Sequence, residues 1–261
     1  MYFGKLIAGL LGFLLLGWAG LVLGLLVGHA FDRGLARNMA FSSPEQLEAI
    51  RQQFSETCFT LLGVIAKADG RVSEEEIQQA EHIMTELGIE GTQREAAIGY
   101  FKQGAAPDFQ IEPVISSFLE RSQGNRQLNQ TLLMFLITMA LADGVIDPSE
   151  REVMQACARQ MGFAEAAFNH LLGMIEAQSH FNRFGETAPA DADLLADAYR
   201  ALGVAPDSDQ RTVKRAYRKL MSENHPDKLI ARGVPEAMVK LGTEKAQEIQ
   251  AAYELIKKSG Q

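Results

Sequence analysis

The feature that most constrains this chain is an uncharged stretch near its amino terminus. Residues 6–27 contain no Asp, Glu, Lys or Arg and are rich in Leu, Gly and Val. As an α-helix, a stretch of this length extends about 33 Å, enough to cross a hydrocarbon core of roughly 30 Å. We therefore predict a transmembrane helix over residues 6–28, in contact with the lipid bilayer, and a membrane anchor over residues 1–40.

A cleaved signal peptide is the alternative, because residues 28–30 (Gly-His-Ala) resemble a cleavage site. The apolar stretch is longer than the roughly 7–15 residues of a signal peptide, and one Lys precedes it, so a retained helix is favoured. Arg33 and Arg37 follow the stretch and Lys5 precedes it. This small excess of positive charge weakly favours a cytoplasmic carboxyl-terminal side.

Glycine recurs along one face of the predicted transmembrane helix. A strip of this kind lets two helices approach closely in lipid and can drive homodimerisation, although glycine is also common in membrane helices in general. The four positions follow each other at steps of three, four and four: Gly17, Gly20, Gly24 and Gly28.

Charge is unevenly distributed along the rest of the chain. Residues 41–190 hold ten Lys or Arg against twenty-one Asp or Glu, whereas residues 191–261 hold twelve against eleven. An acidic middle and a nearly neutral end argue against nucleic-acid binding. Cys58 and Cys157 lie in apolar helical patterns far from each other, which favours core packing over a disulfide or a metal site.

The middle of the chain is expected to be an all-helical domain over residues 41–178. Its apolar residues recur with helical spacing, and no alternating run is long enough to predict a strand. One motif occurs twice, as Ala-Lys-Ala-Asp-Gly-Arg-Val-Ser-Glu-Glu-Glu at residues 66–76 and as Ala-Leu-Ala-Asp-Gly-Val-Ile-Asp-Pro-Ser-Glu at residues 140–150. Each copy stands between an apolar helix and an amphipathic helix.

The repeated motif is explained by the architecture of a helical turn. Gly70 and Gly144 suit the left-handed residue that ends a helix. Ser73 with Glu76, and Asp147 with Glu150, have the spacing of capping boxes. The turn then needs no ligand, and its polar residues serve the fold.

Metal binding is the alternative interpretation of the same residues, if the two turns pack face to face. Neither copy has the carboxylate spacing of a calcium loop, so no metal or other cofactor is expected. An enzyme is not expected either, because the His residues of this region have no paired nucleophile. The low-priority metal candidates are Asp69, Glu75, Glu76, Asp143, Asp147 and Glu150.

The last part of the chain, residues 193–261, is predicted to be a helical hairpin with a polar tip. A basic amphipathic segment over residues 209–224 is followed by His225, Pro226 and Asp227, and a second long helix is expected from Pro235. Proline cannot continue a helix and disfavours helical geometry in the residue before it. We therefore expect these three side chains outside both helices, within reach of a partner. Residues 179–192 are predicted to be a flexible linker.

Basic helix, His-Pro-Asp and a second helix over residues 194–258 resemble the J-domain of the DnaJ family. The resemblance implies stimulation of ATP hydrolysis by a DnaK-type chaperone, without chemistry by the J-domain itself. Matched to the family motif, the partner-binding residues are the tripeptide with Lys214, Tyr217, Arg218 and Lys219. Arg211 and Arg215 complete the basic helix face.

Residues 45–177 are similar to the TerB (tellurite-resistance) family. The order of membrane helix, TerB-like domain and J-domain resembles membrane-anchored DnaJ-like co-chaperones of Gram-negative bacteria. This resemblance implies an all-α protein in the inner membrane with a short periplasmic amino terminus and cytoplasmic domains. It also implies a homodimer, an unknown client of the TerB-like domain, and a link to envelope-stress phosphorelay signalling that controls the capsule. A metal-responsive membrane sensor is the alternative function.

Overall fold

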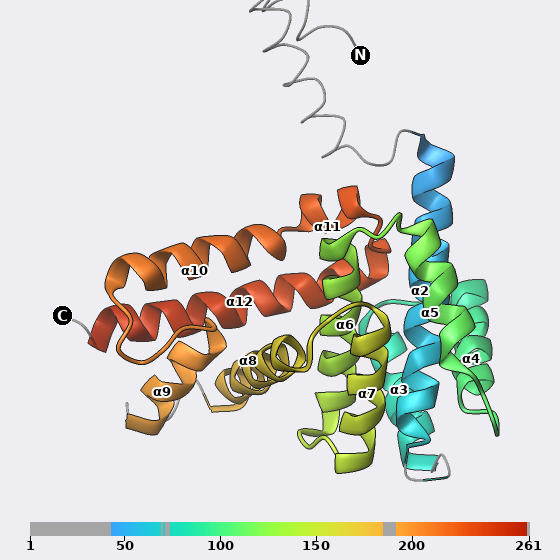
Figure 1. Cartoon of the computed structure of the whole chain (residues 1–261), viewed down its shortest axis with the longest axis horizontal. Helices are drawn as coiled ribbons and strands as arrows, with labels where there is room; N and C mark the ends of the chain where they lie inside the picture. The colour runs from blue at the N-terminus through green and yellow to red at the C-terminus, as the bar shows by residue number, and fades with distance from the viewer. Residues whose placement is uncertain (1–42, 69, 71–73, 185–191, 260–261) are drawn as a thin grey trace, which may run out of the picture. The chain divides into compact units, whose positions relative to one another are not determined.

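The computed structural model describes residues 43–68, 70, 74–184 and 192–259, and these contain helices and turns but no strand (Figure 1). The all-α prediction is thereby confirmed for the described part. The elements are α2 (Pro44–Ala66), α3 (Glu74–Glu86), α4 (Gly91–Gly104), α5 (Ile111–Arg121), α6 (Arg126–Ala140), η1 (Leu141–Asp143), α7 (Pro148–Gln160), α8 (Glu165–Phe184), α9 (Ala192–Ala201), α10 (Gln210–Glu223), α11 (Pro226–Arg232) and α12 (Glu236–Ser259).

The chain divides into two compact units between Leu47 and Glu48, and all packing discussed below lies within residues 48–261. The predicted transmembrane helix over residues 6–28 and its four glycines lie outside the described residues. Among the helices of the described part, none is long and apolar enough to span a bilayer.

The middle of the chain is built around α2, whose aromatic residues form the centre of a core. Phe54 is fully buried and meets the rings of Phe118 and Phe135 edge-on, with centroids 6.0 and 5.9 Å apart. Edge-to-face pairs at this distance add to the stabilisation from burial alone. The buried aromatic cluster thus ties α2 to α5 and α6.

Two glycines allow α2 and α4 to approach each other at backbone distance. A Cβ atom on Gly63 would overlap the carbonyl oxygen of Phe101, and one on Gly104 would overlap the carbonyl oxygen of Thr60. Because the overlapping atoms belong to the backbone, no side-chain rotation can relieve them. The contact therefore requires glycine on both helices.

The duplicated turn has the local geometry that its sequence predicts. Gly70 and Gly144 have φ values of 111° and 99°, in the left-handed region. Pro148 is the first residue of α7, and the N–H of Asp147 donates to Glu150 Oε2 at 2.9 Å as part of a capping box. The second capping box is confirmed, whereas Ser73 of the first copy lies outside the described residues.

The carboxyl-terminal domain packs α9, α10 and α12 around one apolar core (Figure 1). Tyr217 of α10 stacks on Tyr253 of α12 with ring centroids 4.1 Å apart and planes 14° apart. This pair fixes α10 against α12. The buried members of the core, with Ala177 supplied by α8, are Ala177, Ala198, Ala201, Leu202, Val213, Ile249, Ala252 and Ile256.

The linker predicted over residues 179–192 is partly wrong, because α8 continues through Phe184 and α9 already begins at Ala192. Residues 178–184 contain neither Gly nor Pro, so nothing in the sequence ends the helix there. Gln178, the residue just before the predicted linker, is buried, and its side-chain amide donates to the carbonyl oxygen of Ala201 at 2.9 Å. Residues 179–184 of the predicted linker thus continue helix α8.

Candidate functional site: a cationic helix leading to His225-Pro226-Asp227

The basic segment forms α10, and its first turn is capped by Asp209. The Asp209 carboxylate accepts a hydrogen bond from the N–H of Thr212 at 2.8 Å. Hydrogen bonding by the Thr212 side chain, together with this backbone N–H, stabilises the charged form and lowers the pKa of Asp209, and nearby Arg215 acts in the same direction. A carboxylate at this position also interacts favourably with the positive end of the helix dipole. The cap therefore sets where α10 begins.

The two faces of α10 have different roles. Val213 is buried in the core, and half-buried Tyr217 stacks on Tyr253, so the Tyr217 ring packs within the domain. The opposite face carries five exposed cationic side chains, here called the cationic face: Arg211, Lys214, Arg215, Arg218 and Lys219. Of these, Lys219 lies 3.9 Å from Glu223. The face leads along α10 towards the tripeptide.

The sequence predicted that the tripeptide lies outside the helices, and this prediction is partly wrong. His225 is the N-cap of α11, Pro226 is its first residue, and Asp227 stands in its first turn. Proline suits this position because its φ angle is preorganised for a helix and the missing N–H has no intrahelical partner there. The prediction missed α11 because a helix of this length has too few turns for a readable period.

The imidazole of His225 has a defined orientation at the start of α11. Its Nδ1 accepts a hydrogen bond from the N–H of Asp227 at 3.2 Å, which requires that Nδ1 carry no proton. The neutral ring then bears its proton on Nε2. The Asp227 carboxylate is 3.8 Å from Nδ1, too far for a hydrogen bond. The side chains of His225 and Asp227 are 56% and 89% exposed, so the imidazole N–H donor and the carboxylate acceptor are both accessible to a partner.

Residues outside the predicted site hold the tripeptide in place. Leu229 of α11 is fully buried and lies where a Cβ on Gly242 of α12 would overlap it. The guanidinium of Arg232 donates to the carbonyl oxygen of Glu223 at 3.1 Å, and burial lowers the pKa of Arg232. The amide of buried Asn224 donates to the carbonyl oxygen of Leu220 at 2.9 Å.

These contacts tie the turn and α11 to the end of α10. Arg232 of α11 donates to the carbonyl oxygen of Glu223, the last residue of α10, while the Leu220 carbonyl oxygen accepts from both the backbone N–H and the side-chain amide of Asn224. The sequence offers one signal for this arrangement, a glycine at position 242 in the middle of a helical pattern, since such a glycine often marks a close approach. No signal of comparable strength identifies Arg232.

The candidate metal residues are not brought together where the structure describes them. Asp147 and Glu150 serve the capping box of α7, Asp69 lies outside the described residues, and the side chains of Glu75, Glu76 and Asp143 are likewise outside them. Within the described part, no three His, Cys, Asp or Glu side chains form a group that could hold a metal ion. Metal binding by the duplicated turn stays the alternative interpretation, and the expectation of no metal stays a prediction.

The two cysteines behave as core residues. Cys58 and Cys157 are both free and buried. Burial raises the pKa of each thiol, to about 12 for Cys157. Neither is therefore a ready nucleophile or metal ligand at neutral pH.

Three family models match consecutive parts of the chain. The model described as the co-chaperone DjlA transmembrane domain matches residues 1–38, the tellurite resistance protein TerB model matches residues 37–172, and the DnaJ domain model matches residues 197–261. The first model covers the uncharged stretch and assigns it to a membrane domain. The other two agree with the helical domains that the structure describes.

Relatives named Co-chaperone protein DjlA match nearly the whole chain. The protein from Vibrio parahaemolyticus is 41% identical over 256 residues, covering 90% of each chain. Those from Escherichia coli K12 and Coxiella burnetii are 38% and 36% identical, each covering 98% of this chain and 97% of the relative. No solved structure matches. Identity at this level over nearly the full length shows the family, and the chain belongs to the DjlA co-chaperones, which combine a membrane anchor, a TerB domain and a J-domain.

Proposed function

We propose that this co-chaperone stimulates ATP hydrolysis by a DnaK-type chaperone in the cytosol while its amino-terminal segment holds it at the bacterial inner membrane. One observation carries the proposal: the exposed cationic face of α10 leads directly to exposed His225 and Asp227. Charge for encounter and hydrogen-bonding groups for recognition thus lie on one continuous stretch of chain.

The cationic face supports the first step, which is encounter. Five exposed positive side chains on one helix attract an acidic surface of the chaperone, which raises the association rate more than the final affinity. Such attraction weakens as salt screens it, over a Debye length of about 8 Å at physiological ionic strength. The encounter therefore brings the tripeptide close to the chaperone before specific contacts form.

The tripeptide supports the second step, which is recognition of one chaperone state. The Asp227 carboxylate can accept from a basic group of the partner, and the Nε2–H of His225 can donate to a partner oxygen. Because α11 and its supporting contacts already hold both groups, little order has to be gained on binding. A J-domain that binds the hydrolysis-competent state more tightly shifts the chaperone towards that state. ATP chemistry stays within the chaperone.

The cellular arrangement follows from the same proposal. A cytosolic chaperone requires the TerB-like domain and the J-domain on the cytoplasmic side, with a short amino-terminal segment in the periplasm. The glycine strip, comprising Gly17, Gly20, Gly24 and Gly28, would pair two copies within the bilayer. The TerB-like domain would bind the client, and envelope-stress phosphorelay signalling would be the process served.

Single-turnover ATP hydrolysis by a bacterial DnaK tests the proposal, with the full chain held in lipid nanodiscs. We expect the wild type to accelerate hydrolysis and His225→Gln to lose the acceleration. His82→Gln is the matched control, because His82 is an exposed histidine on α3, far along the chain from the tripeptide. Undiminished acceleration by a folded His225→Gln protein would contradict the proposal.

A further inference from the structure

Helix α8 packs on both sides of the boundary between the TerB-like domain and the J-domain. It contacts α6 and α7 of the TerB-like domain, and α9 and α12 of the J-domain (Figure 1). Ala177 of α8 is 1% exposed and belongs to the apolar core of the J-domain. One helix thus contributes to the packing of two domains.

The contact between α8 and α9 is as close as the interior of a domain. A Cβ atom on Gly203, just after α9, would lie 2.7 Å from Met174 Sδ and 3.0 Å from His170 Nε2. The buried amide of Gln178 donates to the carbonyl oxygen of Ala201 beside it. The hydrogen bond gives this buried amide a partner that it has only when the two segments are in contact, so it favours the closed contact.

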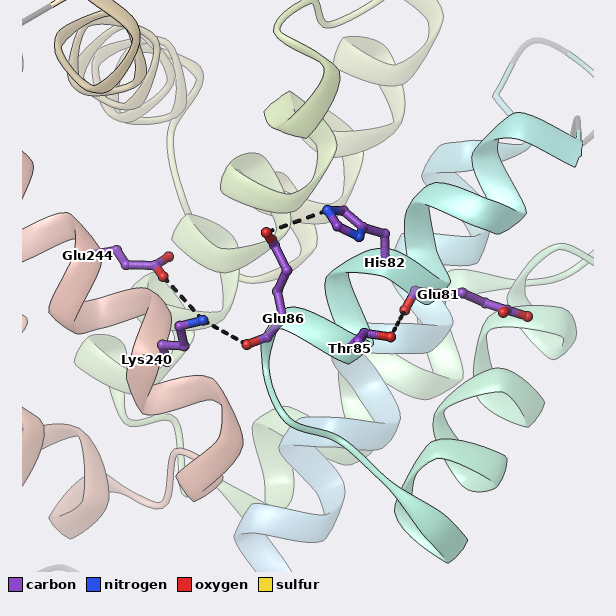
Figure 2. Close-up of polar contacts among 6 residues, drawn as sticks. All are labelled: Glu81, His82, Thr85, Glu86, Lys240 and Glu244. Atoms are coloured by element: carbon purple, nitrogen blue, oxygen red, sulfur yellow. Dashed lines mark hydrogen bonds and ion pairs between the residues drawn. The ribbon is translucent and has the colours of Figure 1, made fainter.

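A second contact joins α12 to the end of α3. Lys240 Nζ donates to the carbonyl oxygen of Glu86 at 2.8 Å and lies 3.8 Å from Glu244 Oε1 (Figure 2). Glu86 is the last residue of α3, so its carbonyl oxygen has no partner within the helix. A lysine at a helix carboxyl terminus also interacts favourably with the helix dipole. Lys240 therefore acts as a cap supplied by the other domain.

Between these contacts, the TerB-like domain covers a charged pair on α12. Lys245 Nζ and Glu248 Oε2 are 2.7 Å apart, and their side chains are only 4% and 8% exposed. Both line a cavity of about 230 Å³ together with residues of α3, α6 and α8, among them Thr138 and Ser179. Charged side chains are rarely buried without a partner, and this pair is buried at the contact with the other domain.

We propose that one face of the TerB-like domain, formed by α8 and the carboxyl-terminal end of α3, is a docking surface whose partner is the J-domain of the same chain. The two domains then move as one rigid unit. The cationic face and the tripeptide stay exposed in the docked arrangement, so docking fixes their direction without blocking them. A client that displaces α3 or α8 would move α12 as well.

Distance measurement between spin labels tests the docking on the full chain in nanodiscs, with labelled chain diluted in excess unlabelled chain so that only distances within one copy contribute, and needs no chaperone. Labels are placed at Glu120→Cys on α5 and Gln250→Cys on α12, both exposed positions. Cys58 and Cys157 are buried, with raised thiol pKa values, and react slowly with the label. The docking predicts a single narrow distance distribution in the wild type, and a broad distribution would overturn it.

A matched pair of substitutions on α8 locates the docking surface. Ala177→Arg places a charged side chain in the shared core and is expected to abolish the narrow distance, with the helix content of the chain largely retained. Ala167→Arg puts the same side chain at an exposed position of the same helix and is expected to leave the distance unchanged. Equal distributions for the two variants would overturn the assignment.

The contact at Lys240 gives a second measurement that does not risk unfolding. Lys240→Met is expected to speed amide exchange at Leu87 and Ile89, which close the last turn of α3. Lys257→Met is the control, since Lys257 is an exposed lysine at the other end of α12. Unchanged exchange at the end of α3 in Lys240→Met would contradict the contact between α3 and α12.

Discussion

Replacement of Gly242 by Ala gives the sharpest test of how the tripeptide is held. The added Cβ would overlap Leu229 Cδ1 and lie 3.5 Å from the carbonyl oxygen of Asn224. Leu229 is fully buried, so its side chain has no free space to enter. Overpacking of this kind costs about 1–3 kcal/mol, whereas Gly to Ala within a helix contributes about 1 kcal/mol of stabilisation. We expect a net loss of about 1 kcal/mol in local stability.

The sign of the effect should reverse when Leu229 is shortened. In a Leu229→Ala background the overlapping methyl group is absent, and the added Cβ fills part of the space left behind. Only the gain in helix propensity then remains, about 1 kcal/mol in favour of Ala. The two substitutions should therefore couple by about 2 kcal/mol, as expected for residues in direct contact.

Amide exchange along α11 and α12 measures this coupling in the full chain, because it reports local opening separately from global unfolding. A change of about 1 kcal/mol corresponds to about fivefold in protection. Gly242→Ala should lower protection about fivefold in the wild type and raise it by a similar factor in the Leu229→Ala background. Equal effects in both backgrounds would refute the proposed contact between α11 and α12.

Two further predictions concern α4 of the TerB-like domain and α10 of the J-domain. Gly104→Ala should destabilise the TerB-like domain by about 1–3 kcal/mol or more, because the added Cβ overlaps backbone atoms. Gly99→Ala on the same helix should stabilise the domain, because nothing lies within 4 Å of the added Cβ. Thermal unfolding compares the two variants. The pKa of Asp209 is lower in the folded protein than in the unfolded chain. The cap should therefore stabilise α10 fully at pH values above the ordinary Asp pKa of about 4. This stabilisation should be lost as the pH falls through the pKa of Asp209 in the folded protein. Amide exchange in the first turn of α10 should show this loss in the wild type and be independent of pH in Asp209→Asn, after correction for intrinsic rates.

Much of the local structure could be predicted because it depends on neighbouring residues. The left-handed glycines at positions 70 and 144, the capping box at Asp147, and the cationic face of α10 all follow from patterns spanning a few residues. The exposure of His225 and Asp227 was also predicted, since proline had to interrupt the helix there.

What the sequence did not show depends on contacts between distant segments. Helix α11 was missed because its seven residues are stabilised by Leu229 packing near Gly242 and by Arg232 binding the end of α10. The extent of α8 was underestimated because Gln178, just before the predicted linker, is buried and donates to the Ala201 carbonyl oxygen, a contact that no periodic pattern identifies. Tertiary packing overrode the polar composition in both places.

The most direct test of the co-chaperone mechanism compares two exposed aspartates of the J-domain. Single-turnover ATP hydrolysis by a bacterial DnaK is measured with full-length Asp227→Asn and with Asp207→Asn, which stands in the loop before α10. If the carboxylate at the start of α11 is the group recognised by the chaperone, Asp227→Asn loses the acceleration and Asp207→Asn keeps it. Acceleration at the wild-type level by Asp227→Asn would contradict recognition through the tripeptide.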